Sequence, residues 1–399
     1  MPQSSGGRLP PVLAAFALCS FAIGTTEFLS IGLLPQIATG LSVSIPAAGG
    51  LVSAYAVGVV VGAPALIALG TRLPRRTLML ALMAVFVAGN LAAAAAPSFG
   101  TLFAARFVTA LPHGAVFGLS AVIAAQLVAP ERRATAIAAT FLGLTLSTCI
   151  GAPLGTLVGQ QFGWRVAFLV VAGLGGLALL ALLITMPALP RPAEVTLRRE
   201  AQALILPRIV LLLAIATIGF GGVFAALGYL APILEEDAGF SEASAVWGLA
   251  VFGVGLTVGN VLSPRLQRAT GSRRESYVRI VQVLAVLVVV LVAFAASAHV
   301  PALAVLGIFA VGVVGFTLVP IVQGQLLEEA SGAPTLTSAA MHSAFNAGNA
   351  LGPLAGGVAI GAGLGNPSAP AAGALLSAVG LLVAYFGLVR RAAPAKVPA

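Results

Sequence analysis

Residues 11–34 read PVLAAFALCSFAIGTTEFLSIGLL, an apolar run of membrane-spanning length that carries a single acid, Glu27. An α-helix needs about 20 residues to cross the hydrocarbon core of a bilayer. A carboxylate inside such a helix costs about 2.5–3.5 kcal/mol on insertion scales, so it usually has a task such as carrying a proton or meeting a cation. The stretch therefore predicts a membrane-spanning helix with a functional acid at Glu27.

The composition of the whole chain agrees with a membrane location. Hydrophobic residues make up 59% of the 399 residues and charged residues only 8%, whereas soluble domains are about 25% charged. Lipid cannot satisfy backbone N–H and C=O groups, so the spanning segments must be helices or a closed barrel. The length of the apolar runs favours helices, and we predict an all-α membrane protein.

Apolar runs of similar length recur along the chain between short polar connections. They predict twelve membrane-spanning helices, at residues 11–34, 46–69, 77–96, 101–126, 134–159, 165–186, 209–234, 244–263, 276–297, 301–327, 335–361 and 369–389. The longest polar interruption runs from Pro187 to Arg208. We therefore expect two six-helix halves, residues 1–190 and 209–399, joined by a cytoplasmic linker at 191–208.

The two halves repeat each other in sequence. Four positions of the first half recur in the second at one constant offset: Pro35, Tyr55, Gly58 and Gly62 match Pro232, Phe252, Gly255 and Gly259. Pro153 matches Pro353 at nearly the same offset. Because each half has an even number of spans, the repeat is parallel, about an axis along the membrane normal. Such a duplication favours an interface cavity that opens alternately to each side.

Basic residues gather in alternate loops. They are Arg8; Arg72, Arg75 and Arg76; Arg132 and Arg133; Arg191, Arg198, Arg199 and Arg208; Arg265, Arg268, Arg273, Arg274 and Arg279; and Arg390, Arg391 and Lys396. One intervening loop instead carries Glu235, Glu236, Asp237 and Glu242. This asymmetry follows the positive-inside rule and predicts that both termini are cytoplasmic. It also explains the net charge of +9 without a nucleic-acid partner; the expected partner is the lipid bilayer.

The sequence offers no pattern for catalysis. The histidines, His113, His299 and His342, lack the spacing of metal ligands, and no nucleophile–base set or phosphate-binding glycine loop is present. Cys19 and Cys149 lie in apolar runs and are expected to be small packing residues. We therefore expect neither an enzyme nor a cofactor or metal site, and an ion gradient as the energy source.

Four stretches carry more specific patterns. They are Gly24-Thr25-Thr26-Glu27-Phe28 with Leu33-Leu34-Pro35; Gly70-Thr71-Arg72-Leu73-Pro74-Arg75-Arg76; Arg106 with Pro112-His113-Gly114; and Gly151-Ala152-Pro153-Leu154-Gly155 with Gly159. Together they resemble the major facilitator superfamily, and within it the twelve-span drug:proton antiporters that include arabinose-inducible, sugar and chloramphenicol efflux proteins. The resemblance covers nearly the whole chain. It implies the fold of two pseudo-symmetric halves, a bacterial inner-membrane location and a single working chain.

Three residues are expected to couple protons to transport: Glu27, Arg106 and His113. At about 1.5 Å per residue, Glu27 lies past the midplane of its helix, towards the outer face. The resemblance implies that Arg106 faces the interior and assists proton transfer. His113 is expected to join a proton relay, because the histidine side chain ordinarily titrates near neutral pH. The alternatives are that Glu27 is permanently paired with Arg106 or caps a broken helix, that Arg106 lies near its helix end and snorkels, and that His113 satisfies a local hydrogen bond.

Five residues are expected to act in gating. The resemblance implies such a role for Gly70 and Arg75, although Pro74 stands where the family has Asp, and ordinary positive-inside topology explains the arginine equally well. Gly151, Pro153 and Gly155 form the other group. Proline bends a helix and glycine permits close helix approach, so this group predicts a pivot, which the resemblance associates with antiporters. Small residues are, however, common in any membrane bundle.

Polar residues within the spans are candidates for substrate binding. They are Tyr55, Asn90, Ser147, Thr148, Asn260, Gln323, His342, Asn346 and Asn349. Asn346 and Asn349 lie three apart on one helical face and are placed to meet one ligand together. The amides serve equally well as interhelical hydrogen-bonding groups.

The sequence thus predicts an alternating-access secondary transporter that exports a small organic molecule, a drug or a sugar-like compound, in exchange for protons. Protons and substrate would each favour a different opening of the protein. Two alternatives remain at this stage. One is a proton symporter that imports a nutrient, and the other is a polytopic membrane sensor without transport.

Overall fold

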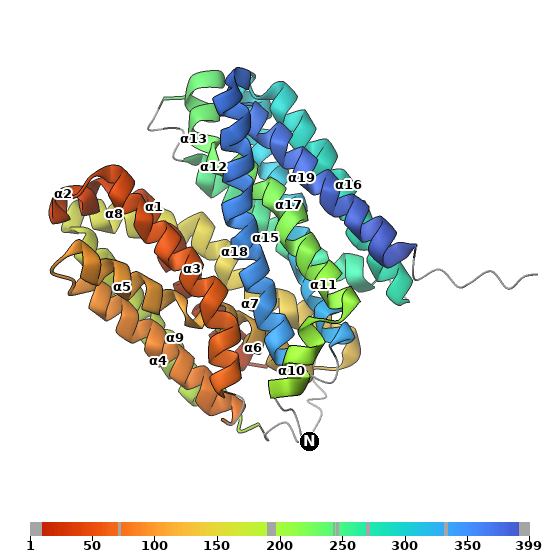
Figure 1. The fold of residues 1–399 in the computed structure, drawn as a ribbon. Coiled ribbons are helices and arrows are strands. Elements are labelled where there is room, and N and C mark those ends of the chain that lie inside the picture. The colour runs from red at the N-terminus through yellow and green to blue at the C-terminus, as the bar shows by residue number, and fades with distance from the viewer. Residues whose placement is uncertain are drawn as a thin grey trace, which may run out of the picture. The chain divides into compact units, whose positions relative to one another are not determined.

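The computed structural model describes residues 10–70, 73–189, 197–241, 244, 247–268, 272–330 and 334–390. Across these ranges the chain is helical and contains no strands (Figure 1). Twelve helical stretches are long and apolar enough to cross a membrane. The prediction of an all-α membrane protein with twelve spans is confirmed. Several predicted loop residues lie outside the described residues, namely Arg8, Arg72, Arg191, Glu242, Arg391 and Lys396.

The first six spans contain several helices that are interrupted. The helices are α1 (Val12–Gly32), followed by the short α2 (Leu34–Leu41); α3 (Ile45–Gly70); α4 (Arg75–Ala94); α5 (Phe99–Ala110) and α6 (Pro112–Gln126); α7 (Arg133–Leu146) and α8 (Ala152–Phe162); and α9 (Trp164–Thr185). Pro112 begins α6, which explains the break after α5, because proline cannot supply a backbone donor there. Between α7 and α8 the chain forms a π-helical segment, η2 (Ser147–Gly151).

The last six spans are built in the same manner. They are α11 (Pro207–Ala214), η3 (Ile215–Gly219) and α12 (Phe220–Gly228), followed by α13 (Leu230–Pro232) and η4 (Ile233–Asp237); α15 (Trp247–Arg268); α16 (Arg273–Ser297); α17 (Pro301–Glu329); α18 (Pro334–Ala359) with η5 (Ile360–Leu364); and α19 (Ser368–Ala384) with η6 (Tyr385–Val389). The predicted linker holds a helix that the sequence analysis missed, α10 (Leu197–Leu204).

The chain packs as two compact units. The first comprises Met1–Ala203 with Ala330–Asn346, and the second Leu204–Glu329 with Ala347–Ala399. The six-helix halves at 1–190 and 209–399 are defined by the sequence repeat, and the packing units differ from them in where α10 and the start of α18 belong. The helix α18 is continuous, so its first part packs within the first unit and its remainder within the second (Figure 1).

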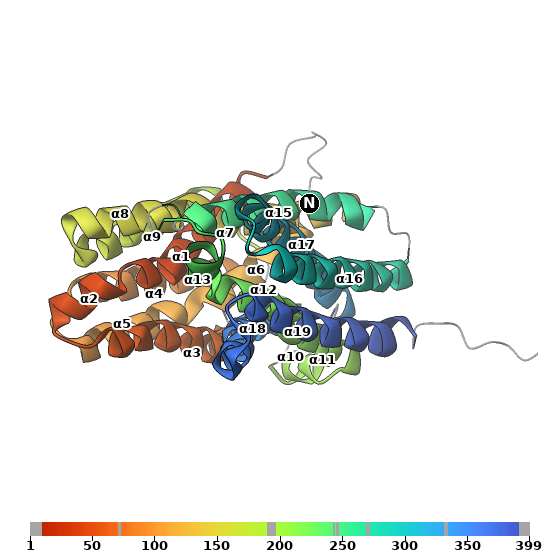
Figure 2. The same ribbon diagram turned by 90° about the horizontal axis from the view of Figure 1, so that it is seen from above.

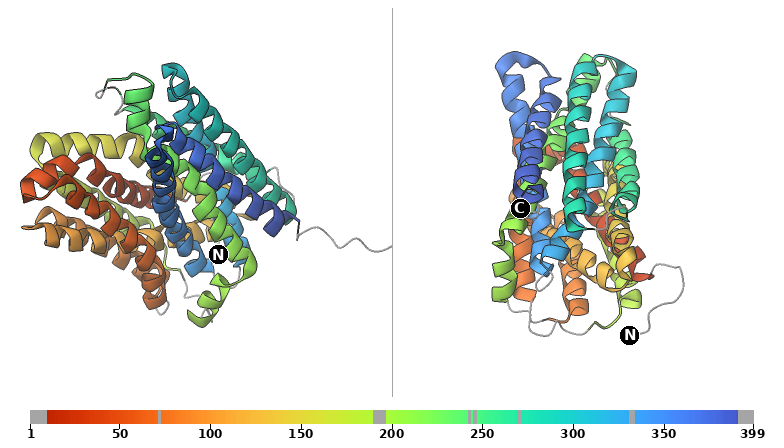
Figure 3. Two further views of the ribbon diagram at one scale, coloured as in Figure 1. Left: turned by 45° about the horizontal axis from the view of Figure 1, so that its top comes forward. Right: turned by 90° about the vertical axis from the view of Figure 1, so that its right-hand side faces the viewer.

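Each unit is a bundle of long helices. In the first unit α1 packs on α7 and α9, and α4 packs on α5 and α9; Figure 2 shows these helices running alongside one another. In the second unit α17 packs on α15 and α16, and α19 packs on α16 and α12, as the right-hand view of Figure 3 shows for the long helices.

The contact between α1 and α7 depends on glycine. A Cβ atom added at Gly143 would collide with the carbonyl oxygen of Ala17, and one added at Gly24 would collide with the Ser147 side chain. Backbone cannot move aside as a flexible side chain can. Small residues at such crossings allow the close van der Waals packing that holds membrane helices together. The α1 helix, which carries Glu27, is therefore fixed closely on α7.

We predict that Gly143→Ala lowers the free energy of unfolding by about 1–3 kcal/mol, as overpacking of a tight contact does. The matched control is Gly176→Ala in α9, where an added Cβ meets no atom within 4 Å. Both substitutions gain the same intrinsic helix propensity, so their difference reports the contact alone. The measurement is the thermal unfolding midpoint in detergent. Equal midpoints for the two variants would contradict the tight α1–α7 contact.

Candidate functional site

Glu27 and Arg106 both lie within the first unit. Glu27 lies on α1 and is partly exposed, whereas Arg106 lies on α5 and is fully buried. The carboxyl and the guanidinium are close enough to attract each other. Within the part of the chain that the structure describes, however, no ion pair within 4.0 Å and no hydrogen bond joins them. The permanently closed pair considered above is therefore not what this conformation contains.

The Arg106 guanidinium is held by an aromatic face and one hydroxyl. Its Cζ lies 4.4 Å from the centroid of the Tyr55 ring, within the range of a cation–π interaction, and its Nη1 donates to Thr26 Oγ1 at 3.1 Å. Its Nε and Nη2 have no hydrogen-bond partner among the described residues. Two strong donors thus remain in a fork that matches the geometry of a carboxylate.

Thr26 and Asn90 form a hydrogen-bonded chain that ends at Arg106. Thr26 Oγ1 donates to Asn90 Oδ1 at 2.8 Å, and Asn90 Nδ2 donates to the carbonyl oxygen of Phe86 at 3.0 Å within its own helix. Both side chains are fully buried. The structure therefore places Asn90, a candidate for substrate binding, in the chain that orients Arg106. Thr26 was not among the predicted site residues, although it directly precedes Glu27.

Tyr55 connects Arg106 to His113. The Arg106 guanidinium lies over the Tyr55 ring, and the Tyr55 hydroxyl is hydrogen-bonded to Nδ1 of His113 at 3.1 Å. Tyr55 and His113 are each 2% exposed, so the bond is shielded from solvent. Residues predicted separately for proton coupling and for substrate binding thus form one contiguous group, and the first of them in the chain, Glu27, lies at its partly exposed end.

His342 extends this group to α18. Its ring lies 4.5 Å from that of Phe117 and 5.6 Å from that of Phe141, nearly parallel to both, and its centroid is 5.8 Å from that of His113. Its Nε2 has no hydrogen-bond partner in the described part of the chain. The sequence analysis missed the two phenylalanines. The spacing of four between His113 and Phe117, which puts both rings on one face of α6, indicates Phe117 alone, whereas Phe141 lies on α7.

The remaining candidates of the first unit donate hydrogen bonds to nearby backbone carbonyls of their own helical stretch, while Oδ1 of the buried Asn346 has no hydrogen-bond partner among the described residues. Ser147 and Thr148 both donate to the carbonyl oxygen of Leu144, at 2.7 and 3.2 Å, and both are fully buried in η2. Asn346 Nδ2 donates to the carbonyl oxygen of His342 at 3.0 Å. The structure does not bring Ser147 or Thr148 into the group around Arg106.

In the second unit the candidate amides lie on three helices. Asn260 is on α15 and Gln323 on α17, and both are buried. Asn349 is on α18 and partly exposed, unlike its predicted companion Asn346, which is buried.

The predicted pivot lies beside α1. A Cβ atom at Gly151 would collide with Thr25, and one at Gly155 would stand 2.8 Å from Leu29 Cδ1. Pro153 occupies the second position of α8, directly after the π-helical segment. Single-turn π-helical segments frequently mark functional sites. Gly151 and Gly155 thus pack on the same helix, α1, that carries Glu27.

The loop after α3 is tied to the linker helix. Gly70 packs so closely on Leu78 that an added Cβ would collide with it. The Arg75 guanidinium donates to Gln126 Oε1 at the end of α6 and is attracted by Glu200 of α10. Burial raises the pKa of the Glu200 carboxyl above its usual range, and hydrogen bonds from Thr335 and Leu336, with Arg75, oppose that rise.

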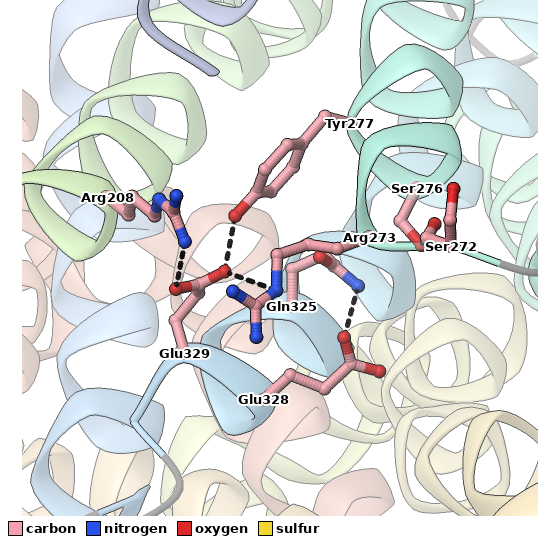
Figure 4. A network of polar contacts seen from close by, with 8 residues as sticks. All are labelled: Arg208, Ser272, Arg273, Ser276, Tyr277, Gln325, Glu328 and Glu329. Atoms are coloured by element: carbon pink, nitrogen blue, oxygen red, sulfur yellow. Dashed lines mark hydrogen bonds and ion pairs between the residues drawn. The ribbon is translucent and has the colours of Figure 1, made fainter. Parts of the chain in front are cut away.

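A second polar network occupies one end of the second unit (Figure 4). The Glu329 carboxylate, at the end of α17, lies 3.5 Å from Arg208 Nη1 of α11 and 3.2 Å from Arg273 Nε of α16, and it accepts a hydrogen bond from Tyr277. Glu329 is 9% exposed, whereas both arginines are about half exposed. One carboxylate therefore joins three helices.

We predict that Arg273→Gln lowers the free energy of unfolding by about 1–3 kcal/mol, because it removes one ion-pair partner from a nearly buried carboxylate. Arg274→Gln is the control, since the adjacent Arg274 is exposed and lies outside the network of Figure 4. Thermal unfolding in detergent distinguishes them. Should Arg274→Gln cost as much as Arg273→Gln, the loss would reflect net charge and the network would have no structural role.

Twelve candidate spans, with a buried guanidinium and a partly exposed acid inside them, define a polytopic membrane protein with charged groups in its interior. The chain belongs to the Major Facilitator Superfamily, whose family model matches residues 16–341. It is therefore a multi-pass transporter of small molecules and not an enzyme.

The relatives agree with this assignment. The chain is 38% identical to the inner membrane transport protein YdhP of Escherichia coli over 374 residues, which cover 94% of this chain and 95% of YdhP. It is 36% identical to the chloramphenicol resistance protein of Streptomyces lividans over 94% of this chain and 95% of that protein. A crystal structure of the Escherichia coli fucose:proton symporter FucP matches the fold with a TM-score of 0.72 at 16% identity, over 94% of this chain and 98% of FucP.

Proposed function

We propose that the chain exports a small organic molecule from the bacterial cytoplasm in exchange for protons, by alternating access across the inner membrane. The observation that carries the proposal is the unclosed pair of Glu27 and Arg106. An acid and a guanidinium inside membrane spans, attracting each other without contact, form a pair that a proton can open or close. The similarity to a chloramphenicol resistance protein supports the export direction.

The coupling step follows from the two unused donors of Arg106. When Glu27 is neutral, only weak forces draw it to the guanidinium. When it loses its proton, the carboxylate gains a charge-assisted bidentate hydrogen bond to Nε and Nη2. Because Glu27 is on α1 and Arg106 on α5, the protonation state decides how strongly these two helices are pulled together.

Contacts of Arg106 with residues of other helices would transmit this change. A movement of the guanidinium changes its contact with the Tyr55 ring on α3, and Tyr55 is hydrogen-bonded to His113 on α6. His113 lies against the aromatic stack of His342 on α18. Besides α1 and α5, the helices α3, α6 and α18 therefore respond to one proton, and α18 continues into the second unit.

Protons and substrate would exclude each other in this scheme. A substrate that is bound best when Glu27 is ionised favours proton release, and by reciprocity protonation of Glu27 weakens substrate binding. We propose that both termini are cytoplasmic, as the loop charges predict, and that the single chain is the working unit. The proposed substrate is a drug or a sugar-like compound. Chloramphenicol is the first compound to test.

We predict that Glu27→Gln reduces transport of radiolabelled chloramphenicol driven by an imposed pH gradient in proteoliposomes at least tenfold, because glutamine cannot exchange a proton. Glu131→Gln, which changes an exposed acid in the turn Pro130–Arg132 ahead of α7, is expected to leave transport unchanged. The amount of each variant in the membrane is measured in parallel. Wild-type pH-driven transport by Glu27→Gln would rule out the coupling step.

The sign of the gradient separates exchange from the alternatives. Exchange predicts that an outward-directed proton gradient drives chloramphenicol into the vesicles and an inward-directed gradient drives it out. Movement of chloramphenicol in the same direction as the protons would show a symporter. If neither gradient moves chloramphenicol, although the protein binds it, transport as proposed is contradicted and the sensor alternative is favoured.

We predict that Tyr55→Phe slows pH-driven transport roughly tenfold, within the range of a lost proton-transfer group. The attraction between Glu27 and Arg106 is expected to remain. Phenylalanine retains the ring under Arg106 but removes the hydrogen bond to His113. Tyr385→Phe is the matched control, because Tyr385 is 47% exposed. The initial rate as a function of pH is measured for both. An unchanged pH profile in Tyr55→Phe would remove His113 from the mechanism.

A further inference from the structure

The linker helix α10 buries an acid. Glu200 is 2% exposed, although it belongs to an eight-residue helix whose neighbouring arginines, Arg198 and Arg199, are exposed. Acids are rarely buried unless their charge is compensated. The buried Glu200 carboxylate therefore needs groups that compensate its charge. Two distant parts of the chain provide such groups.

The first partner is the beginning of α18. Glu200 Oε2 accepts a hydrogen bond from the Leu336 amide at 2.8 Å, and Oε1 accepts one from the Thr335 amide at 3.3 Å. Amides in the first turn of a helix have no partner within the helix, and this end carries partial positive charge. Glu200 thus caps α18 with a carboxylate that comes from a separate segment.

The second partner is Arg75, at the beginning of α4. Its guanidinium attracts the Glu200 carboxylate and donates to Gln126 at the end of α6. Glu200 is therefore attracted by two positive groups, the first turn of α18 and the Arg75 guanidinium.

Further contacts continue along α18 from the capped end. Ser338 Oγ donates to the carbonyl oxygen of Gly118 on α6 at 3.1 Å, and Ser343 Oγ donates to that of Val60 on α3 at 3.2 Å. Above Ser338 lies His342 in its aromatic stack. Glu200 is thus the terminal member of a row of contacts that holds the first part of α18 within the first unit.

We propose that Glu200 is a positioning residue for transport: it holds the N-terminal end of α18 on the first unit until the transport cycle releases it. The inference rests on the proposed alternating access. The helix that Glu200 caps belongs to both units, so holding or freeing its end biases the conformation of the transporter.

The test is hydrogen exchange measured by mass spectrometry on the purified full chain. Relative to wild type, Glu200→Gln and Glu200→Ala are expected to exchange the amides of residues 335–343 roughly tenfold faster, as for a lost helix cap. Arg198→Gln, an exposed residue of the same helix, is expected to exchange as wild type. Unchanged exchange in α16 shows that the variants are folded.

Transport assays separate this inference from the proposed function. Glu200→Gln is expected to slow chloramphenicol exchange severalfold, with faster hydrogen exchange at the start of α18 as its signature. Glu27→Gln is expected to reduce pH-driven transport at least tenfold while Glu200 still protects the Thr335 and Leu336 amides. Wild-type protection of residues 335–343 in both Glu200 variants would overturn the proposal. So would an equal loss of protection in Arg198→Gln, because the effect would then belong to α10 as a whole.

Discussion

A charge inside the hydrocarbon region must be compensated by protein, and this constraint explains the centre of the first unit. The fully buried guanidinium of Arg106 receives a ring face from Tyr55 and a hydroxyl from Thr26, and nothing closer than electrostatic attraction from Glu27. This compensation is incomplete, since two donors remain unused. An ionised Glu27 would complete it, and for this reason protonation of one acid is able to alter helix packing.

The polar groups around this centre form a chain with few branches. Thr26 and Asn90 fix Arg106 to α1 and α4, and Tyr55 passes the contact to His113. The π-helical segment before Pro153 and the glycines that follow it lie against α1 itself. Helices that are packed on glycine move as rigid bodies more readily than they deform. The proposed motion is therefore a displacement of α1 relative to α5.

The fold was predictable from the sequence, because twelve apolar runs leave the backbone no alternative to helices. Glu27 and Arg106 were also accessible, since a charge within an apolar run is visible without a structure. The partners of such charges were not. Thr26, Phe117 and Phe141 have ordinary residue types, and only the fold brings them together. Glu200 was hidden for a different reason: a polar linker does not show which of its acids is buried against a helix end.

The most direct test of the account is the protonation of Glu27 itself, followed by infrared difference spectroscopy of the purified protein during a pH titration. The account predicts a carboxylic-acid band that is present at low pH, disappears in one step as the pH rises, and is absent from Glu27→Gln. Addition of chloramphenicol should shift that step. If the spectra of wild type and Glu27→Gln instead show no difference in this band at any pH, Glu27 does not exchange a proton and the coupling mechanism is contradicted.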